Sequence, residues 1–375
     1  MIKKQRLIKL VRDLIRIDSQ NPPGNESRIA CFVKDYLEAA GLKIKLYEFK
    51  KGRTNLVSVM NPGKGKKSLL ITPHLDTVPK GSGWRSDPFS GRIIDNKIFG
   101  LGATDCKGNL ACAMEALRSL SEEKIALDYT LIFAATADEE TGSEFGLAPL
   151  LKKKILAPDA AVVLDSDDFS IIVAQKGLIH VKVSVFGKRA HGAYPWLGEN
   201  AIDSAVNIIR ELKARRFAYK KNRYLKGPTV NVGTIKGGDK VNIVADWCEF
   251  ELDFRFLPGM SAKDILKDLR RSVKKYSEKF RIEVNGIQDF FLIKENYSLV
   301  ESLKKAIFSA GARPLIMGSE GATTISFFQE AKIPAVATGF GCEGCAHTAN
   351  EYIRVDSLYK GAIALKAFLK NFKFK

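Results

Sequence analysis

Histidines and carboxylates gather in a few short polar segments of this chain, which has only four histidines. His74 and Asp76 follow the apolar run SLLIT at residues 68–72. Residues two apart on an extended segment point the same way, so one could bind a metal while the other orients it. Taken alone, the H-x-D pattern is equally typical of a surface loop.

Further candidates follow other apolar runs or lie in glycine-rich loops. Asp105 lies in GLGATDCKGN, where an acid could bind a metal or cap a helix. Glu139 and Glu140 follow YTLIFAA; one could ligate a metal while its neighbour accepts a proton from bound water, or both could be a solvated strand end. Asp165 ends the run AAVVL, and His347 follows PAVATG within CAHTANEYI.

Most of these candidates share one position, at the carboxyl ends of predicted strands. Open α/β sheets bind ligands at that edge. Two histidines and three carboxylates form a ligand set suited to two zinc ions, with one glutamate left over as a base. The coincidence indicates a metal site more strongly than any single member does.

The elements that must position these residues alternate along the first half of the chain. Strands are predicted at residues 68–72, 129–135 and 160–164, and helices at 108–120 and 146–154. Such near-continuous apolar strands suit a parallel sheet that is covered on both faces.

A second pattern begins near Lys176, where LIHVKVSVFG alternates apolar and polar residues. The order strand–helix–strand–strand–helix–strand then indicates a ferredoxin-like unit. The predicted fold is therefore α/β: a doubly wound, mostly parallel sheet in residues 1–175 and 291–375, interrupted by a ferredoxin-like insert at 176–290.

Length and composition limit the classes of protein to which this chain can belong. A chain of 375 residues predicts two domains, and 45% hydrophobic content argues against disorder. The chain lacks an apolar run of 18 residues, which argues against a membrane span. The basic N-terminus shows helical apolar spacing rather than a signal peptide, and six scattered cysteines do not form a disulfide framework; both favour a cytoplasmic protein.

The formal charge of +18 allows three interpretations: attraction of nucleic acid, attraction of an acidic substrate or carrier, or solubility. The insert alone holds 23 Lys/Arg against 13 Asp/Glu, and Lys213–Lys226 has seven basic residues and no acidic one. The sequence contains no recognisable nucleic-acid module, so nucleic acid is the least favoured partner.

Several blocks, in order along the whole chain, resemble the dinuclear zinc peptidase/deacylase family of acetylornithine deacetylase, succinyl-diaminopimelate desuccinylase, aminoacylase and carboxypeptidase G. The blocks are NPPGNE (21–26), HLDTVP (74–79), GATDCKGN (102–109), DEETGS (138–143), AHGAYPWLGENAI (190–202), VNIVAD (241–246), DFRFLPG (253–259) and HTANEYI (347–353). The resemblance implies two zinc ions, for which cobalt or manganese could substitute. It implies five ligands: His74 and Asp165 on one ion, Glu140 and His347 on the other, and Asp105 bridging both.

The resemblance also implies roles beyond the ligands. Glu139 becomes the general base, acting on a water held between the metals, and Asp76 orients the His74 imidazole. The insert becomes a lid and dimerisation domain. His191 would donate to the oxyanion in the partner subunit of a homodimer, while Arg255 and Asn242 would bind the substrate, Arg255 through its carboxylate.

Other residues depart from the family pattern or stay outside it. Pro73 stands where a glycine often precedes the first histidine, Asp165 replaces the commoner glutamate, and Gln175 replaces a frequent glutamate. The segment at 318–328 lacks the usual Thr/Ser-Asp pair, which bears on substrate identity. His180 matches no catalytic block and is interpreted as structural.

Three cysteines lie near predicted ligands. Cys342 and Cys345 form a C-x-x-C pattern just before His347, which could indicate zinc or redox chemistry but is interpreted as incidental, because a second such pair is lacking. Cys106 follows Asp105 directly and could make the site sensitive to oxidants.

The predicted activity is hydrolysis of the amide bond of an N-acyl-amino acid or related carboxylate-bearing substrate. A dipeptidase or carboxypeptidase would use the same residues and is the alternative. A non-catalytic binding protein is less favoured, because all five ligands and Glu139 are present.

Overall fold

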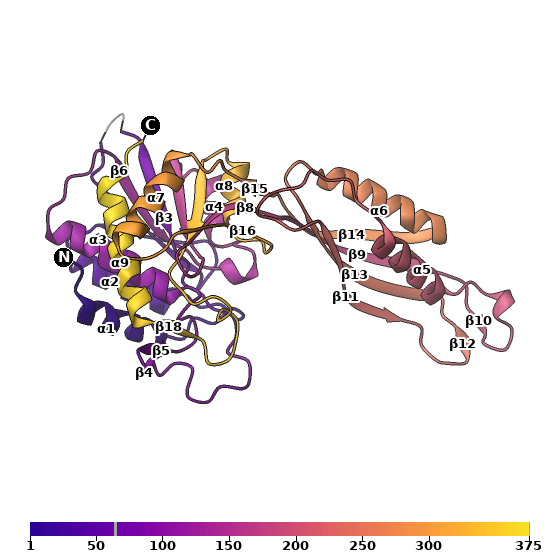
Figure 1. The fold of residues 1–375 in the computed structure, drawn as a ribbon. Coiled ribbons are helices and arrows are strands. Elements are labelled where there is room, and N and C mark those ends of the chain that lie inside the picture. Colours follow the sequence, from indigo (N-terminus) through magenta and orange to yellow (C-terminus); the bar gives the residue numbers. More distant parts are fainter. Residues whose placement is uncertain (64–65, 375) are drawn as a thin grey trace. The chain divides into compact units, whose positions relative to one another are not determined.

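The computed structural model describes residues 1–63 and 66–374 and divides into two compact units. Unit 1 comprises residues 1–173, 293–317 and those from 323 onward, and unit 2 comprises 174–292 and 318–322 (Figure 1). The short segment 318–322 joins unit 2 through a hydrogen bond from the Lys176 N–H to the Ser319 carbonyl, at 3.2 Å. Within the described residues, none of the helices is long and apolar enough to span a membrane.

Unit 1 is built around a large mixed sheet, of which β15 and the last two residues of β8 and of β16 are counted with unit 2. Its strand order is β1-β2-β6-β3-β7-β17-β8-β15, with β16 also pairing with β8. The strands are β1 (Ile44–Glu48), β2 (Thr54–Met60), β3 (Ser68–Thr72), β6 (Thr130–Ala135), β7 (Ala160–Leu164), β8 (Ser170–Gln175), β15 (Phe291–Leu292), β16 (Leu315–Ser319) and β17 (Ala335–Thr338). The central strands β6, β3, β7 and β17 are mutually parallel, and the pairings flanking them are antiparallel.

Helices surround this sheet. They are α1 (Lys4–Ile15), α2 (Ser27–Glu38), α3 (Lys107–Glu122), α4 (Leu147–Lys152), α7 (Ser298–Ser309), α8 (Ile325–Glu330) and α9 (Val355–Asn371). Helix α9 packs against α3 and α7, and α1 packs against α3. The central strands are largely apolar because both of their faces are covered, and every residue of β7 is buried. A small sheet of β4 (Arg92–Ile94), β5 (Lys97–Phe99) and β18 (Tyr352–Arg354) completes the unit.

Unit 2 is an antiparallel sheet in the order β11-β13-β9-β14, with two helices on one face (Figure 1). Its elements are β9 (Gly177–Phe186), β10 (Ala190–His191), α5 (Ala201–Ala214), β11 (Thr229–Gly237), β12 (Ile243–Val244), β13 (Trp247–Phe256), α6 (Ala262–Tyr276) and β14 (Lys279–Gln288), with a 3-10 turn, η2, at Pro195–Leu197. Buried and accessible residues alternate along β9, as the sequence predicted, because only the helix-facing side is covered. The predicted fold class, an α/β sheet domain with a βαββαβ insert, is confirmed.

Candidate metal centre

Four neighbouring parallel strands lead to the predicted metal ligands. His74 follows β3, and Glu140 lies in the 3-10 turn η1 (Glu139–Thr141) after β6. Asp165 follows β7 directly, and His347 lies in the segment after β17. Because the carboxyl ends of parallel strands meet at one edge, residues far apart in sequence come together there.

Two groups of ligand atoms form at this edge and share Asp105. In the first group, His74 Nε2 lies 2.9 Å from Asp105 Oδ1 and 3.8 Å from Asp165 Oδ1. In the second, His347 Nε2 lies 3.1 Å from both Asp105 Oδ2 and Glu140 Oε2. The three ligand atoms of each group lie within 4.8 Å of one another. Asp105 therefore presents one oxygen to each group.

Asp76 organises the loops that carry the ligands. It is fully buried, and the Nδ1 of His74 lies 3.0 Å from its carbonyl oxygen and 3.5 Å from its carboxylate. The backbone N–H groups of Glu139 and Glu140 donate to its two carboxylate oxygens, at 3.1 and 3.2 Å. Asn21 donates to the same carboxylate, at 2.8 Å. One buried carboxylate thus orients an imidazole and fixes the turn that holds Glu139.

Glu351 holds the loop of Asp105 and was not identified from the sequence as a site residue. Its buried carboxylate accepts the backbone N–H groups of Gly102, Thr104 and Asp105, at 2.8, 2.7 and 2.9 Å. Burial raises the pKa of Glu351 to about 7. In the sequence, Glu351 lies in the block HTANEYI, directly before the first residue of β18, Tyr352.

A second buried network supports the turn after β6. The Arg53 guanidinium donates to Asp138, at 2.6 Å, and to Asn21, at 3.1 Å, and forms an ion pair with Glu26, at 2.9 Å. Asp138 also accepts the N–H of Phe145, at 2.9 Å. Arg53 was not predicted as a site residue, since a single arginine in a polar stretch gives no sequence signal.

Burial and crowding shift the pKa values of the ionisable groups at the centre. Burial raises the pKa of Asp165 and Glu140, and the charge of Asp105 adds to both shifts. Hydrogen bonds to Asp105 and Glu140 raise the pKa of His347 to about 10. Burial, followed by the charge of Asp165, raises the pKa of Glu139 well above its usual value. Asp105 differs from these groups: burial would raise its pKa, but hydrogen bonds with His347 and His74 outweigh burial and lower it.

This donor set fits two divalent cations. Imidazole nitrogens and carboxylate oxygens are the ligands that zinc, cobalt and manganese accept in proteins. His74, Asp165 and one oxygen of Asp105 would hold one ion, and His347, Glu140 and the other oxygen of Asp105 the second. Glu139 belongs to neither group, which leaves its carboxylate available for proton transfer.

The remaining predicted residues lie in unit 2. His191 lies on β10, which pairs with β12, and the Gly192 N–H donates to the Asn242 carbonyl, at 2.8 Å. Both His191 and Asn242 are exposed. The His191 Nδ1 accepts the Ala193 N–H, at 3.0 Å, which leaves Nε2 pointing away from that bond. Their predicted roles in catalysis and substrate binding stay predictions.

Arg255 has a partner within unit 2. On β13, its Nε and one terminal nitrogen donate to the two carboxylate oxygens of Asp253, at 2.7 and 2.9 Å. His180 on β9 lies 3.5 Å from the same carboxylate. The guanidinium predicted to bind a substrate carboxylate therefore already holds one from its own strand.

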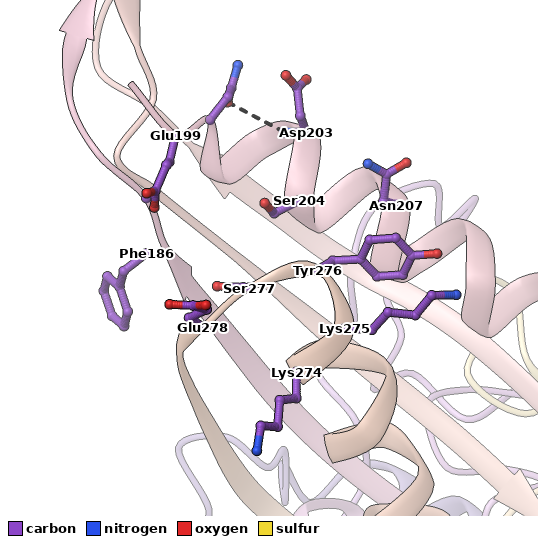
Figure 2. Close-up of a pocket in the computed structure, with 12 residues that line it drawn as sticks. Phe186, Glu199, Asp203, Ser204, Asn207, Lys274, Lys275, Tyr276, Ser277 and Glu278 are labelled. Carbon is purple, nitrogen blue, oxygen red and sulfur yellow. Dashed lines mark hydrogen bonds between the residues drawn. The ribbon is translucent and has the colours of Figure 1, made fainter. Parts of the chain in front are cut away.

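A hollow of about 590 Å³ lies elsewhere in unit 2, between the end of β9 and the facing ends of α5 and α6 (Figure 2). Phe186, Asp203 and Tyr276 are among its lining residues. The residues predicted for catalysis or substrate binding in unit 2 are not among them. This hollow is therefore distinct from the predicted substrate contacts.

Comparison with known proteins places the chain among hydrolases. The sequence model of Peptidase family M20/M25/M40 matches residues 70–371. An acetylornithine deacetylase of Salmonella typhimurium is 31% identical over 84% of this chain and 82% of its own. One from Edwardsiella ictaluri is 28% identical over 93% and 91%. The crystal structure of a tripeptidase from Staphylococcus aureus superposes with a TM-score of 0.83 at 27% identity, covering 99% of this chain and 98% of that one.

Proposed function

This chain belongs to Peptidase family M20/M25/M40 and is an amide-bond hydrolase, and from that premise we propose that it is a dinuclear zinc deacylase of N-acyl-amino acids. The observation that carries the proposal is the pair of ligand groups sharing Asp105. Buried Glu139 interacts electrostatically with members of both groups. The acetylornithine deacetylases among its relatives support an acyl-amino acid as the substrate.

The residues of the centre divide the work of hydrolysis. Bound divalent cations would lower the pKa of water and polarise the amide carbonyl. Glu139 takes the proton from the attacking water and passes it to the leaving amine. Asp76 keeps Glu139 in place through its backbone N–H and sets the imidazole of His74. Glu351 fixes the backbone of Asp105, so that the two carboxylate oxygens of Asp105 stay directed at the two ligand groups.

Peptide hydrolysis is the second candidate, and the likeness to a tripeptidase supports it. Both reactions break a carbon–nitrogen amide bond, and the same base and ligands serve both. They differ in the group on the acyl side, which is a simple acyl group in one case and an amino-acid residue in the other; the carboxylate that Arg255 would bind lies on the amine side in both.

The deciding experiment is product detection by mass spectrometry. Protein loaded with zinc or cobalt is offered N-acetyl- and N-succinyl-amino acids beside dipeptides and tripeptides. Glu139→Gln should lower turnover by about 10²–10⁴-fold while retaining both metals. Glu144→Gln, an exposed acid in the same turn region, is the matched control and should keep its activity. An unchanged rate in Glu139→Gln would refute the role of this base, and cleavage of peptides alone would establish the second candidate.

The assembly and location are part of the same proposal. A homodimer would bring His191 of one subunit to the centre of the other, and light scattering together with a His191→Ala variant tests this. If the partner subunit supplies the oxyanion donor, activity should depend on protein concentration below the dimer dissociation constant.

The cysteines of the chain are all free, which supports a reducing compartment such as the cytoplasm.

A further inference from the structure

Strand β14 forms one edge of the antiparallel sheet in unit 2. It pairs with β9 on one side, and none of the described strands of unit 2 pairs with its other side. An edge strand directs the N–H and C=O groups of alternate residues away from its neighbour, where they can pair with a further strand. Val284 and Ile287 on β14 are 45% and 49% exposed. This edge therefore offers both backbone groups and apolar side chains.

A groove of about 320 Å³ lies between this edge and helix α6, which packs against β14 (Figure 1). Three apolar side chains and three cations line it: Leu266, Ile282 and Val284, and Lys263, Lys267 and Arg270. The cations gather on one side because residues three or four apart share a face of a helix. Leu266 and Ile282 also pack against the core of unit 2, so the fold itself holds this groove in shape.

The positive charge of the groove is not neutralised within the described part of the chain. Its three cations form no ion pair there, because the acids nearby have other partners. Asp268 pairs with Arg215 and Arg271. Glu283 pairs with Arg281, at 2.8 Å. Helix α6 as a whole carries six basic and two acidic residues. Uncompensated cations thus lie beside apolar side chains and an unpaired strand edge.

We propose that the edge of β14 and the groove beside it bind an acidic, extended peptide segment of another protein, which joins the sheet as a further strand. In strand addition, backbone hydrogen bonds give affinity and side-chain contacts give specificity. The inference goes beyond the proposed activity and holds whichever amide the enzyme cleaves.

The spacing of the cations suits acids on a strand. Lys263 and Lys267 are four residues apart, which is about 6 Å along a helix axis. Alternate residues of a strand lie about 6.6 Å apart and point to the same side. Two acids at alternate positions would therefore meet these two lysines, and an apolar residue at the next alternate position would meet the apolar lining of the groove.

Two other occupants fit this surface less well. A second copy of the chain, paired through a two-fold axis, would place the same surface of both copies face to face and bring their cations together. Nucleic acid would match the charge through its phosphates, but it would leave the apolar side chains and the edge backbone unused. An acidic extended peptide matches all three features.

The test measures binding of a labelled peptide, Thr-Glu-Thr-Glu-Thr-Val-Thr, to the full chain by fluorescence anisotropy. Binding should be saturable and should weaken as salt is added. In hydrogen exchange, the peptide should protect backbone amides of β14 and leave those of β11 unchanged. A peptide with lysine in place of both glutamates should not bind. Neither should a form N-methylated at each internal residue, because it keeps the charges but cannot donate backbone hydrogen bonds.

Variants locate the binding site. Lys263→Glu combined with Lys267→Glu should weaken binding at least tenfold, and Val284→Ser should weaken it about fivefold. Lys220→Glu combined with Lys221→Glu changes the net charge equally, on an exposed loop after α5, and should bind as wild type. Hydrolysis and zinc affinity should stay at wild-type values in all of them, so failure here is distinct from failure of the proposed activity.

Four results would overturn the proposal. They are an absence of saturable binding, equal losses in both double variants, exchange protection outside β14, and tighter binding of a thymidine oligonucleotide than of the peptide. Light scattering adds a further check: an altered oligomeric state in the Lys263→Glu, Lys267→Glu variant would assign this edge to a second copy of the chain instead.

Discussion

Arg255 and Asp253 form a two-point ion pair on one face of β13, with donor–acceptor distances of 2.7 and 2.9 Å. Residues two apart on a strand share a face, so the sequence DFRF places these groups together. A carboxylate held this way competes with any substrate carboxylate for the same guanidinium.

Removing this competitor should improve substrate binding if Arg255 grips a carboxylate. We expect Asp253→Asn to lower the KM for an N-acetyl-amino acid several-fold and to leave kcat little changed. An N-acetyl-amino acid amide, which lacks the carboxylate, should show no such gain. Glu249→Gln, on the same strand and paired with Lys182, is the control. A raised KM in Asp253→Asn would mean that Asp253 positions Arg255 instead of masking it.

Glu351 should control metal affinity without touching metal. Glu351→Gln replaces one acceptor oxygen by an N–H₂ group, which faces backbone donors in the loop of Asp105. We expect a 10–100-fold loss of zinc affinity, the usual effect of removing an outer partner of a ligand. Competition with a chromophoric chelator measures it. Glu343→Gln, an exposed acid on the facing loop, should bind zinc normally; equal losses in both variants would contradict the assignment.

Metal removal should destabilise the protein, because the carboxylates of Asp105, Asp165 and Glu140 are then left close together. At a metal concentration 1,000 times the dissociation constant, binding stabilises the fold by about 4 kcal/mol. Differential scanning fluorimetry with and without chelator should show a lower Tm that zinc restores. His347→Ala should reduce this response. His180→Ala, which removes the other half-exposed histidine near a carboxylate, should retain it.

Glu26 should make stability fall as pH rises. Burial, then the charge of Asp76, raises its pKa to about 7, and among the described residues its Oε2 has no hydrogen-bond partner. Because the pKa of Glu26 is higher in the folded state, its contribution to the free energy of unfolding is fully present below the unfolded pKa of 4.5. As pH rises through 7, the free energy of unfolding falls by about 3 kcal/mol.

Urea titrations at several pH values test this. Between pH 5 and pH 8, Glu26→Gln should gain stability relative to wild type, since its side chain cannot ionise. The exposed Glu144→Gln should show a difference from wild type that does not vary with pH. A constant difference for Glu26→Gln as well would show that Glu26 does not titrate in this range.

The sequence predicted the bounds of strands most accurately where burial alone decides the structure. The strands β3 and β7 have the predicted bounds, because a strand buried on both faces is an unbroken apolar run. The bounds of the edge strand β14 (Lys279–Gln288) are harder to predict, since this strand is largely accessible and carries little apolar signal. Side-chain pairing was harder to foresee: the partners of Arg53 and Glu351 lie far away in sequence, and only the fold brings them together.

Each unit has its own core, and substitutions in the two cores should act separately. Phe250 is fully buried between the sheet of unit 2 and its helices, and Phe133 is fully buried on β6 in unit 1. Replacing either by alanine should cost about 3–5 kcal/mol locally. In hydrogen exchange, Phe250→Ala should lose protection in peptides of β9 and β13, while β3 and β7 stay protected. Phe133→Ala should lose protection in peptides of β3 and β7, while β9 and β13 stay protected. Zinc should restore protection only in unit 1 of the Phe133→Ala variant. Equal loss across both units in either variant would mean that the chain unfolds as one cooperative body.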